Sequence, residues 1–108
     1  MTDQELIELA AKAHGKIDYY KITLDGAFKK GGGIWSPLLD DGDALRLAVK
    51  LQLEIRPGLG STSVSNVCYK DPLSFVWYDG DPYKATRRAI VMAAAKIAKI
   101  NENGEGDD

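Results

Sequence analysis

The stretch WSPLLDDGDALRLAV, from Trp35 to Val49, decides the fold of this chain. Pro37 ends an incoming strand because its ring removes a backbone hydrogen-bond donor. The aspartates that follow suit a helix start, where unpartnered N–H groups and the positive end of the helix dipole favour carboxylates. Apolar residues then cover a wide arc. The stretch therefore predicts an amphipathic helix over residues 41–51, with Asp41 as its cap.

The segments before this stretch predict one helix and one or two strands. Apolar and charged residues occupy opposite faces over residues 3–14, which indicates an amphipathic helix, and Gly15 follows as its C-cap. Residues 19–24 alternate in the manner of a strand. The second of these strands, which the pattern leaves open, would be a short return strand of Ile34 and Trp35 after a glycine-rich loop.

The segments after it predict three strands and a final helix. Strands are expected over residues 53–56, 62–69 and 73–78. Asp81 suits the N-cap position of a helix that begins at Pro82 and reaches residue 100. We therefore expect one globular domain over residues 1–100 and an acidic flexible tail over residues 101–108.

The strand around residue 76 is apolar on both of its sides. Phe75 and Trp77 alternate with Val76 and Tyr78, so a sheet containing this strand needs cover on both faces. We expect Phe75 and Trp77 to be core residues. The sequence thus predicts an α+β fold: a three-layer α/β/α sandwich around a mainly antiparallel sheet of four to five strands, in the order α-β-(β)-α-β-β-β-α.

Composition narrows the class of protein. The chain has 108 residues, 44% of them hydrophobic, and a net charge of −2, which is typical of a globular domain and not of a basic nucleic-acid-binding domain. Cys68 is the only cysteine, and its strand position predicts a buried, inert thiol. The sequence has no apolar run long enough to span a membrane, and its N-terminus does not have the pattern of a signal peptide. We therefore expect a cytoplasmic protein.

The sequence offers weak support for catalysis. Asp40, Asp41 and Asp43 could attract a divalent cation, but the regular ligand spacing of a calcium loop is missing, and helix capping explains them better. His14 lies at the end of a predicted helix, where it suits the last carbonyl groups. We expect neither an enzyme nor a metal or cofactor site.

Three features could contact a partner. Lys29 and Lys30 precede the Gly31–Gly33 run, a loop that could become ordered on binding. Trp35 sits between that loop and a proline, where an exposed ring would anchor an interface. A third, basic feature occupies the first turns of the last helix, where double-stranded RNA-binding domains contact phosphates. Its residues are Lys84, Arg87 and Arg88.

Two blocks of the chain resemble a known family. Trp35 to Leu51 is similar to the WNPLxDDGDALRLAVKL signature of phage and prophage proteins with a phage alpha/beta/alpha sandwich domain, although Ser36 replaces the more usual asparagine. Asp81 to Val91 resembles the family's final helix, with its Asp-Pro start and Arg-Arg pair. The resemblance implies a small accessory protein and no particular activity.

These observations leave three hypotheses. The first is a non-enzymatic phage accessory protein, monomer or homodimer, that binds an unidentified protein such as a host factor. The second is binding of duplex RNA or DNA by the basic face of the last helix. The third is a metal-dependent enzyme that uses Asp40, Asp41 and Asp43.

Overall fold

The longest helix, α3 (Pro82–Asn103), is the element against which most of the molecule packs. The computed structural model describes residues 1–103. Helix α1 (Asp3–His14) and helix α2 (Asp41–Lys50) both contact α3. Ala93 and Ala94 are fully buried, and their small side chains let neighbouring elements approach the helix closely. The described part of the chain is α+β, as predicted.

The strands form two separate sheets. β1 (Tyr19–Thr23), β2 (Gly26–Lys29) and β3 (Ile34–Trp35) make one antiparallel sheet, called sheet A here. β4 (Glu54–Pro57), β5 (Ser61–Ser65) and β6 (Ser74–Trp77) make the second, sheet B. The prediction of a single sheet with four to five strands is therefore wrong, and β2 is a strand that the sequence analysis did not expect.

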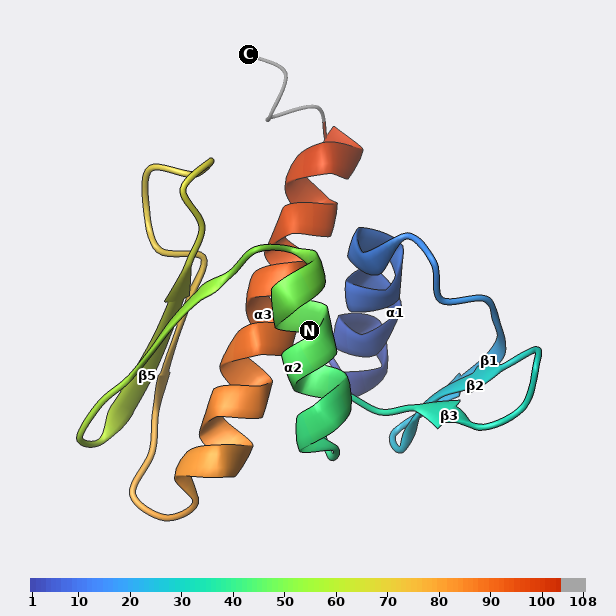
Figure 1. The fold of residues 1–108 in the computed structure, drawn as a ribbon, viewed down its shortest axis with the longest axis horizontal. Helices are drawn as coiled ribbons and strands as arrows, with labels where there is room; N and C mark the ends of the chain where they lie inside the picture. Colours follow the sequence, from blue (N-terminus) through green and yellow to red (C-terminus); the bar gives the residue numbers. More distant parts are fainter. Residues whose placement is uncertain (104–108) are drawn as a thin grey trace.

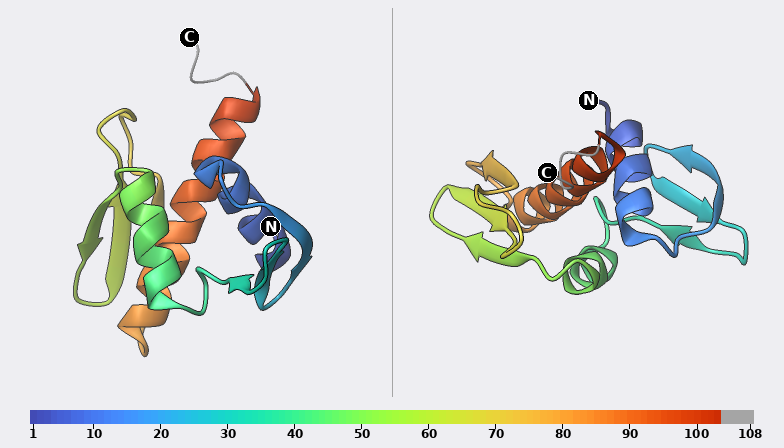
Figure 2. Two further views of the ribbon diagram at one scale, coloured as in Figure 1. Left: turned by 45° about the vertical axis from the view of Figure 1, so that its right-hand side comes forward. Right: turned by 90° about the horizontal axis from the view of Figure 1, so that it is seen from above.

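The helices lie between the two sheets (Figures 1 and 2). Sheet A packs on α1, and sheet B packs on α3. Two side-chain contacts fix sheet B to the helix: Ser74 Oγ donates to Ala89 O at 2.6 Å, and the Thr62 and Thr86 hydroxyls lie 3.1 Å apart. Within residues 1–103 each sheet is covered by helices on one face only, so the expected sandwich with helices on both faces of one sheet is not what the structure has.

Local capping sets the helix ends. Thr2 and Glu5 form a capping box at the start of α1, and Gly15 ends that helix in the left-handed conformation, with φ of 82°. Asp81 caps α3, as predicted, because its carboxylate accepts the N–H groups of Tyr83 and Lys84. Helix α3 continues to Asn103, into the segment expected to be a tail, and the remaining residues of that tail lie outside the described part.

A buried asparagine ends strand β5 early. The Asn66 amide donates to Leu51 O at 2.8 Å and Gln52 O at 3.2 Å, and its side-chain oxygen accepts the Cys68 N–H at 2.7 Å. The backbone therefore turns at Asn66, and β5 stops at Ser65 and does not continue to Tyr69. This turn leaves Cys68 exposed, so the prediction of a buried thiol is wrong.

Candidate functional site

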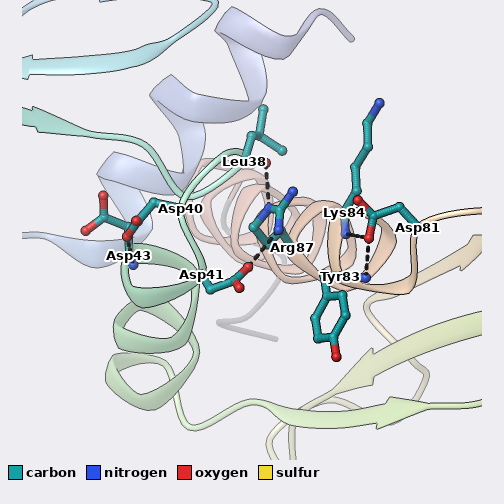
Figure 3. A network of polar contacts seen from close by, with 8 residues as sticks. All are labelled: Leu38, Asp40, Asp41, Asp43, Asp81, Tyr83, Lys84 and Arg87. Atoms are coloured by element: carbon teal, nitrogen blue, oxygen red, sulfur yellow. Dashed lines mark hydrogen bonds and ion pairs between the residues drawn. The ribbon is translucent and has the colours of Figure 1, made fainter.

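The aspartates at the start of α2 are all engaged by backbone or arginine groups, and Figure 3 shows the contacts of Asp40 and Asp41. Asp40, not Asp41, is the N-cap: its Oδ2 accepts the Asp43 N–H at 2.8 Å. The predicted cap Asp41 is the first helical residue, and its Oδ1 accepts Arg87 Nη1 at 2.7 Å. The cap lies one residue earlier than predicted because Asp40 keeps an extended backbone, with ψ of 121°.

Asp43 joins the helix to the preceding loop. Its Oδ2 accepts the Ser36 N–H at 2.9 Å, and its Oδ1 accepts Arg46 Nη2 at 2.8 Å, which raises the pKa of that guanidinium. The three carboxylates are thus engaged with backbone and arginine groups. Among residues 1–103, no group of three or more His, Cys, Asp or Glu side chains is arranged to hold a metal ion.

The two arginines of the predicted basic face both reach helix starts. Arg87 Nε donates to Leu38 O at 2.9 Å, alongside its contact with Asp41. Arg88 Nη1 donates to Asp3 Oδ1 at 3.0 Å. Lys84 extends from the same turns and is exposed. Ion pairs within the molecule therefore neutralise two of the three basic side chains that were considered for phosphate contacts.

A shallow groove lies next to the Arg87–Asp41 pair. Its volume is about 470 Å³, and its surface is mainly apolar. Helices α2 and α3 and strand β4 contribute the lining side chains: Asp41, Ala44, Leu45, Ile55, Pro57, Pro82, Tyr83, Thr86, Arg87 and Ile90. No nucleophile with an adjacent base lines this groove.

Trp35 is a core residue, contrary to the prediction that it anchors an interface. Only 4% of its surface is exposed. The His14 ring packs edge-on against it, with centroids 5.9 Å apart and planes at 74°. Partial burial, with Lys50 and Lys16 nearby, lowers the pKa of His14. His14 Nδ1 accepts the Lys16 N–H at 3.3 Å, so this ring nitrogen binds an amide and not a helix carbonyl as predicted.

The exposed aromatic residues of sheet B are Phe75 and Trp77, which the sequence analysis placed in the core. They are 50% and 76% exposed and lie edge to face, with centroids 5.0 Å apart. Their cross-strand partners in β5 are Ser63 and Ser61. We call the surface formed by these four residues the aromatic face. The alternating pattern of β6 predicted that both of its sides are apolar, but it did not indicate which side α3 covers.

Sheet A carries a second aromatic pair, formed by the exposed Tyr20 and the half-buried Phe28. The Tyr20 and Phe28 rings lie 6.3 Å apart, and Lys21 Nζ is 5.9 Å from the centre of the Phe28 ring. Lys29, the last residue of β2, and Lys30, the first residue after it, are both exposed, so the loop predicted to include both lysines begins only at Lys30. Lys30 Nζ lies 3.4 Å from Asp18 Oδ1. The lysines were predicted as contact residues, but Tyr20 and Phe28 were not; each of these aromatic residues directly precedes a lysine, and this was the available signal.

Comparison with protein-family models, with curated proteins and with solved structures finds no match to this chain. No helix in residues 1–103 is long and apolar enough to cross a membrane.

Proposed function

We propose that this chain is a non-enzymatic binding protein that docks on another protein through the aromatic face of sheet B. The observation that carries the proposal is the exposure of Trp77, whose side chain is 76% exposed although it packs edge to face against Phe75. Tryptophan and other large aromatic side chains dominate the energetics of protein interfaces when a partner removes them from water. A tryptophan held in place by a neighbouring ring and a strand loses little conformational freedom on binding.

The partner segment that fits this face is an amphipathic helix. Sheet B already accommodates a helix on its other side, where Val64 and Ser74 pack against α3. On the outer side, the small Ser61 and Ser63 flank the two rings and leave a strip that an apolar helix stripe would cover. Such a helix would complete the α/β/α layering that the apolar alternation of β6 predicts.

We further propose that the protein is a phage or prophage accessory factor of the bacterial cytoplasm. The support is the similarity of Trp35–Leu51 and Asp81–Val91 to proteins with the phage alpha/beta/alpha sandwich domain. Arg87 of the second block binds Asp41 and Leu38 of the first, so the two similar blocks form one contact region.

Site-specific photocrosslinking tests the docking surface. Benzoylphenylalanine replaces Trp77 in one variant and Val49, which is exposed on α2, in the control. We expect the Trp77 variant to give a discrete adduct in bacterial cells that the control does not give. Phe75→Ser in the same variant should reduce the yield, and the cross-linked peptide should map to an amphipathic helix.

Three outcomes would contradict the proposal. Equal adducts from positions 77 and 49 would show that the aromatic face has no selectivity. An adduct of twice the chain's mass would show that a second copy, and not a partner helix, covers the face. Absence of any adduct would leave Trp77 without a protein partner and would also overturn the proposal.

A further inference from the structure

The outer face of sheet A combines aromatic rings with lysines, and it is separate from the aromatic face of sheet B. Register pairing places Lys21, Phe28 and Ile34 side by side on this face, because Lys21 pairs with Phe28 and Phe28 with Ile34. The alternate set, Ala27 and Trp35, is buried toward α1. Side chains that a strand directs outward in this way form a flat platform.

A hollow of about 470 Å³ lies at one end of this platform. Residues of β1, β2 and β3 and of the glycine loop line it: Tyr20, Phe28, Lys29, Lys30, Gly32, Gly33 and Ile34. Gly32 and Gly33 have φ of 103° and 82°, so the loop adopts a backbone that favours glycine and carries no side chains over the hollow. Tyr20, 66% exposed, forms one wall.

Residues 15–35 have a net positive charge, whereas the whole chain has a net negative charge. Residues 15–35 contain four lysines and two aspartates, whereas the complete chain has a net charge of −2. Lys30 pairs with Asp18, but both side chains are more than half exposed, so this ion pair contributes little and a phosphate can compete for the lysine. Lys29 has its ammonium near Gly33, beside the hollow.

We infer that sheet A binds single-stranded nucleic acid, with bases stacked on Tyr20 and Phe28 and phosphates held by Lys21, Lys29 and Lys30. Aromatic rings set beside cations are the combination by which proteins hold unpaired bases and their backbone. A duplex conceals the faces of its bases from such rings, so the surface discriminates against double strands. This site differs from the basic face of α3, whose Arg87 and Arg88 are bound to Asp41 and Asp3.

Fluorescence anisotropy with labelled oligothymidylate and oligouridylate measures this binding directly. If three lysines contact phosphates, log K should fall with log[salt] with a slope of about −2, and Lys29→Gln with Lys30→Gln should reduce the slope to about −0.7. Tyr20→Leu should weaken binding by about tenfold, whereas Tyr20→Phe, which keeps the stacking ring, should retain the affinity. Circular dichroism of each variant checks that the fold is kept.

The matched control is Lys96→Gln with Lys99→Gln, an equal change of charge on exposed residues of α3. This control should leave affinity and salt slope unchanged. The inference is overturned if the control weakens binding as much as the Lys29 and Lys30 variant, or if a duplex of equal length binds as tightly as the single strand. Absence of any anisotropy change at about 100 μM protein in low salt also overturns it, since that is where even weak non-specific binding is seen.

Discussion

Arg87 on α3 and Asp41 at the start of α2 are 46 positions apart in sequence, and their side chains meet at 2.7 Å. The same guanidinium donates to the carbonyl of Leu38, a buried residue. The side chain of Arg87 is 16% exposed and that of Asp41 is 70% exposed. The arginine therefore serves mainly to satisfy the Leu38 carbonyl and to orient α2 on α3, and the ion pair adds to this.

Arg87→Met should destabilise the protein more than Asp41→Asn does. The methionine keeps the apolar stem but leaves the Leu38 carbonyl without its donor, which costs about 1–3 kcal/mol. The asparagine retains an acceptor at an exposed position and should cost less than about 1 kcal/mol. Urea unfolding of both variants measures the difference, with Arg88→Met as the control, because the side chain of Arg88 is 40% exposed and that of Arg87 only 16%. Equal losses for Arg87→Met and Asp41→Asn would contradict this account.

The two tryptophans should report opposite environments. Trp35→Ala removes a buried ring and should destabilise the fold by about 3–5 kcal/mol. Trp77→Ser removes an exposed ring and should change the free energy of unfolding by less than about 1 kcal/mol. The fluorescence of Trp77→Phe, which retains only Trp35, should be blue-shifted and protected from acrylamide. Strong quenching of that variant would show that Trp35 is accessible.

His14 should make stability depend on pH in one direction. Its pKa in the folded state is lower than the ordinary 6.5, chiefly because burial disfavours the charged ring. The unfolded chain therefore takes up the proton first as pH falls, and the free energy of unfolding decreases from about pH 6.5 downwards through the folded pKa. Above pH 6.5 the contribution of the neutral His14 ring to the free energy of unfolding is fully present.

Chemical denaturation at several pH values, together with an NMR titration of the His14 ring, checks this dependence. His14 is the only histidine, so His14→Gln should flatten the slope between about pH 7.5 and 5.5. A titration midpoint at or above that of the unfolded chain would contradict the burial of the ring against Trp35.

The helices were predictable because their ends depend on neighbours in sequence. The start and end of α1 and the start of α3 follow from Thr2, Gly15 and Asp81, each of which acts within a few residues. Strand β2 escaped prediction because Asp25-Gly26 reads as a turn. Gly26 begins the strand with φ of 139°, and a Cβ there would lie 2.3 Å from Trp35 O.

The division into two sheets could not be predicted, because it depends on which strands pair and which faces α3 covers. The alternation of Phe75, Val76 and Trp77 is the same whether one face or both are buried. The partners of Arg87 and Arg88 lie 46 and 85 positions away, so no local pattern indicates that these charges are neutralised within the fold. Lys29 and Lys30 were predicted in a loop with the adjacent glycines, whereas the structure has Lys29 as the last residue of β2 and Lys30 in the turn that follows.

The position of α3 in the chain has a consequence for how the molecule is made. Both sheets are built from consecutive strands with short connections, so each can pair as soon as its own residues have been synthesised. Sheet B and α1, however, pack on a helix that begins only at Pro82. During synthesis on the ribosome, the apolar faces of sheet B and α1 therefore remain exposed to solvent until residues 82–103 emerge. The core then assembles late and in one step.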